Sequence, residues 1–253
     1  MAYLIYDIGT GNSRVSIVSE QKEMIGLRTF ENRYYRDFRY KDALYFKPEE
    51  MLLEVMRCTG ELLKAHPEVR IEAVTATSAR ESIVLIDRDG RWFYGLPNID
   101  NRGEEWMDAI PGKDEVYRKT GRWVSTVFSA GKLMGLKKRC PDIYTRIEGI
   151  TSLSGWIGYV FTGELVMEYS QACETQLFDI GKREWDEKLC ALFGINPGIL
   201  PRVCAASVPL GRVKGSLCEE LGLQKETVFT AGGADTQAAV YGTDACEKEI
   251  VIV

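Results

Sequence analysis

Over the first thirty residues, apolar and β-branched positions gather in three short blocks, and polar positions separate them. The blocks are "YLIYDI", "RVSIVS" and "MIGLRTF", each rich in strand-forming residues. Consecutive strands that are joined by such short links pair antiparallel. The pattern therefore predicts an antiparallel three-stranded meander at the N-terminus.

The next segment, residues 47–67, has the spacing of an amphipathic helix. Pro48 stands in its first turn, where a missing N–H costs nothing, and Glu49 and Glu50 favour the positive end of the helix dipole. The strand-like "IEAVTATS" follows directly. The chain is therefore expected to open with the order βββαβ.

Beyond residue 80, strand-like and helix-like segments alternate. A hairpin is expected over residues 82–95, around Arg88-Asp89-Gly90, and helices dominate from about 103 to 162, with an interruption near "EGITSLS". Short helices follow near 186 and over 214–222, and "TVFTAGG" leads straight into the helical "ADTQAAVYG". This mixture predicts an α/β fold with a mixed sheet flanked by helices.

Composition places the 253-residue chain among ordinary globular proteins, with 45% hydrophobic and 27% charged residues. Its formal net charge of −5 and its interspersed charges disfavour nucleic acid and anionic membranes as partners. No apolar run approaches the roughly 20 residues that cross a bilayer, and no signal-peptide pattern follows Met1. We therefore expect a cytoplasmic protein with no membrane partner.

The histidine and cysteine content limits the chemistry. His66 is the only histidine, so a Ser-His-Asp triad and a His-rich metal site are disfavoured. The seven cysteines are odd in number and include no C-x-x-C pair, which favours buried, reduced thiols over a zinc site or a redox motif. Any acid–base chemistry is therefore expected from carboxylates.

Four polar groups interrupt the apolar segments. They are Asp7 with Gly9-Thr10-Gly11-Asn12-Ser13, the pair Arg80-Glu81, Asp100 with Arg102 in "NIDNR", and Asp235 in "AGGADTQAA". Each has a structural alternative: a hairpin turn, a solvated ion pair, a loop anchor and a helix N-cap, respectively. Three of the groups follow a predicted core strand, and such strand ends gather at one edge of an α/β sheet. We therefore expect Asp7, Arg80 and Asp235 to lie beside one cleft.

Phosphoryl transfer is the chemistry that suits this set. It needs a metal-binding carboxylate, N–H donors for phosphate oxygens and a carboxylate beside the acceptor hydroxyl. Asp7 would hold Mg²⁺, the Gly-Thr-Gly turn and its hydroxyl neighbours would bind phosphate, and Asp235 would accept the alcohol proton. Arg80 and Glu81 would hold substrate hydroxyls. The chain contains no G-x-x-x-x-G-K-[ST] sequence, so a P-loop protein is excluded.

Several of these stretches resemble a known family. "DIGTGNSR" is similar to the first phosphate motif of the sugar kinase, heat-shock chaperone and actin superfamily, and "AGGADTQAAVYG" resembles the catalytic-aspartate motif of the FGGY carbohydrate kinases. The segment from "YVFTGELVMEYS" to "ALFGI" resembles the long mid-domain segment of that family, so the likeness covers essentially the whole chain in order. Within the family, "SARESIVL", "NIDNRGEEW", "EVYRKTGR" and "TGELVMEYS" are most similar to autoinducer-2 kinases.

The resemblance implies an RNase H-like domain of the actin-like ATPase superfamily, with ATP and Mg²⁺ as cofactors and a small sugar-like substrate. It implies that Asp235 is the catalytic base and that Asp7 serves the metal. The residues implied for ATP phosphates are Gly9, Thr10, Gly11, Asn12 and Ser13, and those implied for the substrate are Arg80, Glu81, Asp100 and Asp235.

Four positions depart from the family pattern: Asn98, Val127, Gly135 and Gly155. The family usually has Trp at the first and third of these positions, an aromatic residue at the second and Asp at the fourth. We therefore expect an aromatic wall of the substrate site to be missing, which disfavours glycerol and ordinary ketoses. Asp7 and Asp235, which carry the transfer chemistry, are unaffected.

The resemblance also predicts the domain organisation. Residues 1–245 are expected to form the N-terminal substrate-binding domain, and residues 246–253, which contain "EIVIV", to begin a C-terminal ATP-binding domain. The predicted function is an ATP-dependent kinase for a hydroxyl of a small sugar-like substrate. A dihydroxypentanedione of the autoinducer-2 type is favoured, and a pentulose or another ketose or polyol is a further candidate.

On this view the isolated chain is inactive, and a homodimer is an option. The alternative function is a non-catalytic sugar-sensing or interaction domain that retains the kinase fold.

Overall fold

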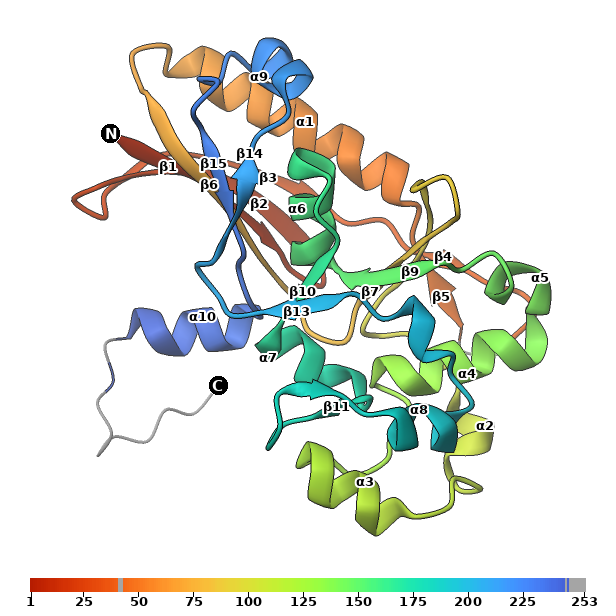
Figure 1. The fold of residues 1–253 in the computed structure, drawn as a ribbon. Coiled ribbons are helices and arrows are strands. Elements are labelled where there is room, and N and C mark those ends of the chain that lie inside the picture. Colours follow the sequence, from red (N-terminus) through yellow and green to blue (C-terminus); the bar gives the residue numbers. More distant parts are fainter. Residues whose placement is uncertain (41–42, 244, 246–253) are drawn as a thin grey trace.

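The computed structural model of the protein describes residues 1–40, 43–243 and 245. Its central feature is a six-stranded sheet in the order β14-β15-β6-β1-β2-β3 (Figure 1). Strands β1 (Ala2–Ile8), β2 (Asn12–Ser19) and β3 (Met24–Glu31) pair antiparallel. The predicted N-terminal meander is therefore confirmed.

The other half of the sheet is built from segments that are far apart in the sequence. β6 (Ile71–Ser78) lies parallel to β1, and β15 (Val228–Thr230) lies parallel to β6. β14 (Pro209–Arg212) closes this edge antiparallel to β15. The long helix precedes β6 in the chain, so the predicted βββαβ opening and the α/β class are both confirmed.

That helix, α1 (Pro48–Ala65), begins at the predicted proline and ends before His66. Glu49 and Glu50 occupy its first turn, where the exposed N–H groups favour negative charge. It packs against β2, β3 and β8 (Trp92–Leu96) and buries one apolar stripe. The sequence therefore predicted this helix to within one residue at its start and two residues at its end.

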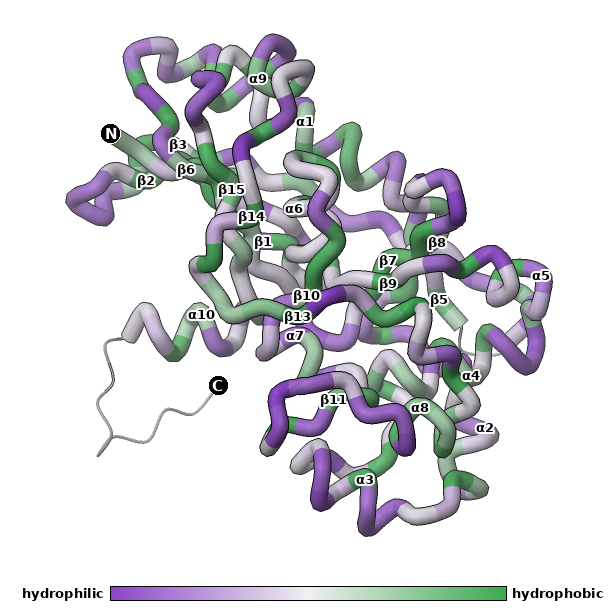
Figure 2. The backbone as a smooth tube through the Cα atoms, in the orientation of Figure 1, coloured by the Kyte–Doolittle hydropathy of each residue, from purple (hydrophilic) through white to green (hydrophobic). Residues whose placement is uncertain are grey.

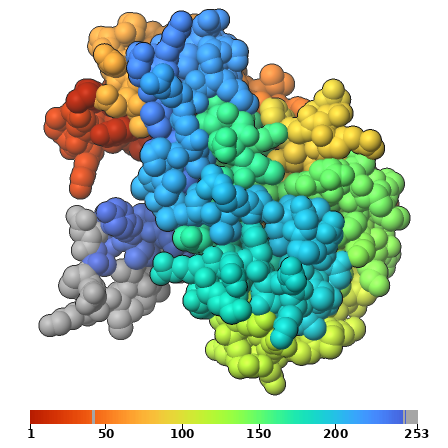
Figure 3. Space-filling model, in the orientation of Figure 1, coloured from red at the N-terminus to blue at the C-terminus, as the bar shows by residue number. Residues whose placement is uncertain are grey.

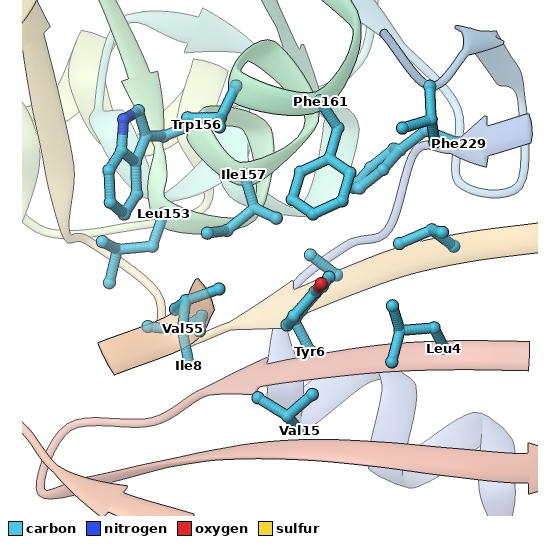
Figure 4. Close-up of a cluster of buried hydrophobic side chains, with 14 of the residues drawn as sticks. Leu4, Tyr6, Ile8, Val15, Val55, Leu153, Trp156, Ile157, Phe161 and Phe229 are labelled. Atoms are coloured by element: carbon cyan, nitrogen blue, oxygen red, sulfur yellow. The ribbon is translucent and has the colours of Figure 1, made fainter. Parts of the chain in front are cut away.

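One face of the sheet carries the larger hydrophobic core. The Tyr6 hydroxyl lies 3.1 Å from Thr59 Oγ1 of α1, and the Tyr6 ring centroid lies 5.5 Å from that of Phe161 in α6 (Leu153–Thr162). Helices α1 and α6 therefore meet the same face of β1. Figure 4 shows this layer, with Leu4 and Ile8 on the strand beside Tyr6 and the α6 side chains opposite.

The opposite face of the sheet is more open. Alternate residues of a strand point to opposite faces, and Tyr3, Ile5 and Asp7 of β1 are exposed or half-buried whereas Leu4 and Tyr6 are fully buried. β6 repeats the alternation. Figure 2 shows hydrophobic stretches concentrated in the sheet and hydrophilic ones in the outer loops.

A second layer holds its own core. The predicted hairpin forms from β7 (Ile83–Ile86) and β8, and β9 (Gly149–Ser152) adds to it at the predicted interruption of the helical stretch. Helices α4 (Ser129–Arg139) and α8 (Glu187–Phe193) contribute to the second hydrophobic cluster, which also contains Leu85 and Ile150 of this small sheet.

The remaining elements are short. They are β4 (Tyr35–Arg36), β5 (Leu44–Tyr45), α2 (Glu104–Met107), α3 (Lys113–Thr120), α5 (Pro141–Tyr144), β10 (Val166–Glu168), α7 (Tyr169–Ala172), β11 (Phe178–Asp179), β12 (Glu184–Trp185), β13 (Arg202–Cys204), α9 (Gly215–Leu221) and α10 (Asp235–Gly242), with 3₁₀ turns at Cys173–Thr175 and Pro197–Ile199.

Some predictions concern single residues or the chain end. Of the six cysteines that the structure describes, all are free thiols and five are buried, as expected. No helix in the described ranges is long and apolar enough to cross a bilayer. Cys246 and the strand predicted within residues 246–253 lie outside the described residues.

Candidate functional site

Three neighbouring parallel strands end at one edge of the main sheet. In the register of β1 and β6, Ile8 lies opposite Ser78, and the loop after β15 runs on to pair Ala234 with Ser78. Functional groups of α/β proteins collect at such carboxyl ends. This register brings the chain segments that carry Asp7, Arg80 and Asp235 to the same edge.

A cavity of about 470 Å³ opens at this edge. Asp7 and Gly9 of the first strand and turn, Thr77 of β6 and Asp235 of α10 contribute to its lining. The whole lining consists of Asp7, Gly9, Arg14, Thr77, Asp235, Thr236, Ala238 and Ala239. Figure 3 shows the surface hollowed between the red N-terminal strands and the dark blue helix α10. Asp7 and Asp235 therefore lie beside one opening as predicted, whereas Arg80 is not among the residues that line it.

Asp235 is the first residue of α10 and follows the cap position, which Ala234 occupies. No side chain caps this helix end, so the N-cap alternative for Asp235 is not realised. Its Oδ1 accepts the N–H of Thr236 at 2.7 Å. The carboxylate therefore lies at the positive end of the helix and borders the cavity.

The double glycine before Asp235 is required by close packing. A Cβ on Gly232 would lie 1.9 Å from the Ala76 carbonyl oxygen, and one on Gly233 would lie 2.7 Å from both Glu168 Oε2 and Ser170 Oγ. The Ser170 hydroxyl also accepts the Ala234 N–H at 2.9 Å. These contacts fix the approach to α10 and thus the place of Asp235.

The Gly-Thr-Gly turn joins β1 to β2 as a hairpin and is anchored through its carbonyls. Asn32 donates its side-chain amide to the Gly9 carbonyl at 2.7 Å and its backbone N–H to the Gly11 carbonyl at 2.9 Å, and the Tyr34 hydroxyl donates to Thr10. In a trans peptide the following N–H points opposite to the carbonyl. The turn therefore aims successive N–H groups away from Asn32 and Tyr34, an arrangement that suits an anion.

The hydroxyl neighbours of this turn behave differently from the sequence-based expectation. Ser13 is fully buried, and its hydroxyl donates to Asn32 Oδ1 at 2.8 Å, so its side chain does not reach the cavity. Because side chains alternate along β2, Ser13 faces the core whereas Asn12 is exposed. The Thr10 hydroxyl accepts from Asn98 Nδ2 at 2.8 Å, which ties the turn to the segment of the expected substrate site.

Asp7, the expected metal ligand, forms an ion pair with Arg14 on the neighbouring strand at 2.7 Å. Both side chains are partly exposed, at 30% and 55%, and a pair in such contact with water contributes little to stability. No group of three or more potential metal ligands occurs in the part of the chain that the structure describes. Asp7 is therefore a single carboxylate, and its ion pair with Arg14 is weak enough to be replaced by contact with another cation.

Arg80 and Glu81 belong to a larger charged cluster. Glu174, which is almost completely buried, accepts from Arg80 Nη1 at 3.4 Å and from Arg122 Nη2 at 2.7 Å. Burial and then the neighbouring Glu174 raise the pKa of Glu81 to about 7, against the opposing charges of Arg80 and the nearby Lys132, and Asp235 adds a smaller effect in the same direction.

Sequence reasoning missed Glu174 and Arg122. Glu174 stands 94 residues from Arg80 and 52 from Arg122, so no local pattern connects the three. The one available signal was an acidic residue within the apolar stretch "ACETQLF", where an isolated carboxylate requires a cationic partner.

Asp100 corrects a prediction. Its side chain has no exposed surface, and its two oxygens accept from Arg102 Nε at 2.7 Å and from the Leu44 N–H at 2.9 Å. Arg102 in turn donates to the Leu44 carbonyl at 2.8 Å. Asp100 is therefore the loop anchor of the alternative interpretation, and its expected contact with substrate is not supported by this arrangement.

Comparison with known families identifies the domain. The model of the N-terminal domain of the FGGY family of carbohydrate kinases matches residues 2–242. The chain belongs to the FGGY family of carbohydrate kinases. The resemblance that rested on the phosphate turn and the Asp235 motif is thus confirmed.

Curated relatives of this FGGY domain carry several names. The chain is 42% identical over 251 residues to "Putative sugar kinase YoaC" of Bacillus subtilis (strain 168), covering 99% of this chain and 52% of the relative. It is 29% identical to an autoinducer-2 kinase of Salmonella choleraesuis (strain SC-B67), covering 93% of this chain and 46% of the relative. It is 31% identical to a glycerol kinase of Thermococcus gammatolerans, covering 98% and 51%. The chain therefore spans about half the length of the curated relatives it matches.

Solved structures show the same fold. A ligand-bound xylulose kinase from Lactobacillus acidophilus matches with a TM-score of 0.89 at 17% identity, covering 96% of this chain and 50% of that one. The ADP complex of Plasmodium falciparum glycerol kinase matches with a TM-score of 0.87 at 23% identity, covering 96% and 50%. The predicted α/β fold, a mixed sheet flanked by helices, is confirmed, and it is the fold of these two kinase structures.

Proposed function

We propose that this FGGY domain supplies the acceptor site and the catalytic base of an ATP-dependent kinase that phosphorylates a hydroxyl of a small sugar-like molecule. One observation carries the proposal: Asp235, Asp7 and the phosphate-type turn residue Gly9 line a single cavity. Phosphoryl transfer needs a base, a metal carboxylate and backbone donors within one site. These three features come from β1, the turn after it and α10. The pairing of β1 with β6 and the bridge between Ser78 and Ala234 hold them at one edge of the sheet.

In this proposal Asp235 accepts the proton of the acceptor hydroxyl as that oxygen attacks the terminal phosphorus of ATP. The positive end of α10 lies beside the Asp235 carboxylate, and the close packing of Gly232 and Gly233 against Ala76 and Glu168 fixes the position of this carboxylate. General-base catalysis of this kind is typically worth about 10²–10⁴-fold in rate.

Arg80 and Glu81 are proposed to bind the substrate hydroxyls. Arg80 is one-third exposed and donates, whereas Glu81 is mostly buried and accepts when ionised. Dihydroxypentanedione of the autoinducer-2 type is the first candidate substrate, because autoinducer-2 kinases are among the relatives at 28–30% identity. Pentuloses, other ketoses and polyols follow, because relatives or neighbours are named as xylulose and glycerol kinases.

The residues at the cavity fit a nucleotide with its magnesium ion. Mg²⁺ usually takes one or two protein carboxylates together with phosphate oxygens and water, and Asp7 and Asp235 supply oxygens at the same cavity. We propose that Asp7 exchanges Arg14 for Mg²⁺, directly or through water, and that the N–H groups of Thr10, Gly11 and Asn12 bind phosphate. The bound ion would neutralise charge on the phosphates.

An ADP-release assay tests the proposal, using the full-length product of the gene that encodes this chain. Dihydroxypentanedione, D-xylulose, D-fructose, gluconate and glycerol would each be supplied with ATP and Mg²⁺. We expect one of them to stimulate ADP release, and Asp235→Asn to lower turnover at least about 100-fold with substrate binding retained.

Asp108→Asn, which makes the same change at an exposed carboxylate outside the cavity lining, is the matched control and should keep most of the activity. If calorimetry detects sugar binding but no phosphate is transferred, the alternative function, a non-catalytic sugar-sensing domain, would be favoured instead. Near-wild-type turnover of Asp235→Asn would contradict the role of Asp235.

A further inference from the structure

Lys132 is a buried lysine that the proposed chemistry does not use. It lies in the first half of α4 and has no exposed surface. Its Nζ donates to the backbone carbonyl of Glu81 at 3.0 Å and to that of Val127. Among the described residues no carboxylate forms an ion pair with it. An ammonium group is costly to bury, so these two carbonyls are an unusual use of a lysine.

The carbonyl that Lys132 binds belongs to a strained residue. Glu81 has φ = 61°, in the left-handed region that residues other than glycine rarely occupy. Such a conformation persists only where the surroundings determine it, and it is frequent at ligand sites. Ser129 Oγ, one turn before Lys132 on α4, donates to the same Glu81 carbonyl at 3.3 Å.

Two donors from one helix therefore fix the orientation of the Glu81 peptide. That orientation carries the Glu81 side chain into the charged cluster. The Glu81 side chain is 11% exposed, and its Oε1 lies 4.0 Å from Arg80 Nε. A right-handed backbone at Glu81 would turn the carbonyl away from Lys132 and redirect the side chain.

We infer that Lys132 is a positioning residue, whose buried ammonium holds Glu81 in its left-handed conformation and so keeps the Glu81 carboxyl in the substrate site. The inference rests on the proposed function only in so far as Glu81 binds substrate. The lysine itself does not reach the reacting atoms; it acts through the backbone of Glu81 and through its charge.

Electrostatics support the geometry. Burial lowers the pKa of Lys132 to about 8, against the opposing charges of Asp100 and Glu81 and in the same direction as Arg102. Glu81, with a pKa of about 7, faces Glu174 and Asp235, which disfavour its ionisation, and Arg80 and Lys132, which favour it. The titrations of Lys132 and Glu81 are therefore linked, and removing the charge of either residue shifts the pKa of the other.

The test is carbon-13 NMR titration of the 253-residue chain with labelled glutamate and lysine, the Glu81 signal being assigned with Glu81→Gln. In Lys132→Met, which keeps the length of the side chain without its charge, the Glu81 midpoint should rise by about one pH unit. Lys138→Met, an exposed lysine on the same helix, is the matched control and should leave the midpoint unchanged.

A second variant keeps the test decisive if Lys132→Met does not fold. Position 81 is partly exposed. In Glu81→Gln the titration midpoint of Lys132 should fall, because a negative charge that favours the protonated lysine is lost. Unchanged midpoints in the variants that fold would overturn the inference.

The binding arm uses calorimetry with dihydroxypentanedione and D-xylulose. If wild-type protein binds one of them, Lys132→Met should weaken that binding about tenfold or more, as expected when a charged hydrogen bond is lost. Undiminished affinity would contradict the positioning role. Failure of the wild type to bind any sugar would instead count against the proposed function, and the NMR result would still decide the link between Lys132 and Glu81.

Discussion

Two carboxylates of the site have opposite surroundings. Asp235 lies at a helix start beside an open cavity, whereas Glu81 is mostly buried between Glu174 and Lys132. A carboxylate at a helix N-terminus faces the positive end of the helix dipole and is placed to accept a proton during reaction. A buried carboxyl with a raised pKa responds to pH near neutrality. The two environments therefore suit two roles: Asp235 as the base that accepts a proton, and Glu81 as a binding group whose charge changes with pH.

The buried carboxyl leads to a prediction about stability. Burial and Glu174 raise the pKa of Glu81 from 4.5 to about 7, so its contribution to stability is full below pH 4.5 and is lost as the pH rises to about 7. At pH 8 the ionised carboxyl therefore costs about 3 kcal/mol relative to a neutral group. Glu81→Gln should raise the melting temperature by several degrees at pH 8 and leave it nearly unchanged at pH 4.5.

Calorimetric melting at the two pH values checks this prediction. Glu72→Gln, which removes an exposed carboxylate from β6, serves as control and should show no such difference between the two pH values. Equal stability of wild type and Glu81→Gln at pH 8 would show that Glu81 ionises without cost.

Arg80 is expected to matter for binding more than for folding. It is partly exposed, and Arg122 would still neutralise the buried Glu174 in its absence. Arg80→Ala should therefore cost no more than about 1 kcal/mol of stability. It should weaken binding of the sugar identified in the ADP-release assay about tenfold or more, since a charged hydrogen bond is lost.

Calorimetry and thermal melting separate the two effects. Arg57→Ala on α1, which also removes an ion-paired arginine but lies outside the site, should change neither affinity nor specificity. A variant at Arg80 that unfolds the domain but keeps its residual affinity would make the pair structural.

At the scale of elements, the glycines before α10 connect packing to function. Gly232 has the Ala76 carbonyl where a Cβ would stand, and a backbone oxygen in a paired strand cannot move aside cheaply. Gly232→Ala should therefore destabilise the protein by about 1–3 kcal/mol. It should also displace Asp235 and lower activity further than the stability loss explains.

Gly60→Ala is the matched control for this substitution. Gly60 lies inside α1, and no atom lies within 4 Å of the position of its added Cβ. The same change there should stabilise the protein by about 0.5–1 kcal/mol, because alanine is the better helix former. Urea unfolding of both variants measures the contrast, and equal effects would mean that crowding at Gly232 is relieved by movement.

Local patterns were sufficient to predict most elements. The meander, α1 and the hairpin all follow from apolar spacing and turn residues, since their defining contacts are close in sequence. The directions of individual polar side chains were harder to predict. Ser13 faces the core because of its position in β2, and Asp100 is buried by Arg102 and Leu44.

Long-range partners explain why other features were not predicted. Glu174 approaches Arg80 only after β6 and the α7 region have packed, and Lys132 reaches Glu81 across 51 residues. The expected loss of an aromatic wall also needs correction at Gly135, where a Cβ would lie 2.4 Å from the Arg102 carbonyl oxygen. Backbone fills the space there, so this position does not leave an opening.

At the scale of the whole molecule, the chain should fold by itself but not transfer phosphate by itself. Two hydrophobic cores lie within the described residues, one between the main sheet and α1 and α6, the other beneath the small sheet. A chain of this length can bury roughly 70% or more of its surface. We therefore expect cooperative thermal unfolding of residues 1–253, and sugar binding through Arg80 and Glu81.

Turnover requires more than the acceptor site. The chain spans about half the length of its curated relatives, and the cavity at Asp235 is lined by residues of β1, its turn, β2, β6 and α10. In-line transfer depends on holding ATP rigidly opposite the acceptor, and such positioning is worth on the order of 7–11 kcal/mol. Purified residues 1–253 should therefore bind sugar in calorimetry yet release no ADP above background with any sugar of the panel. Sugar-dependent ADP release at a rate close to that of the full-length gene product would show that this chain alone positions both substrates.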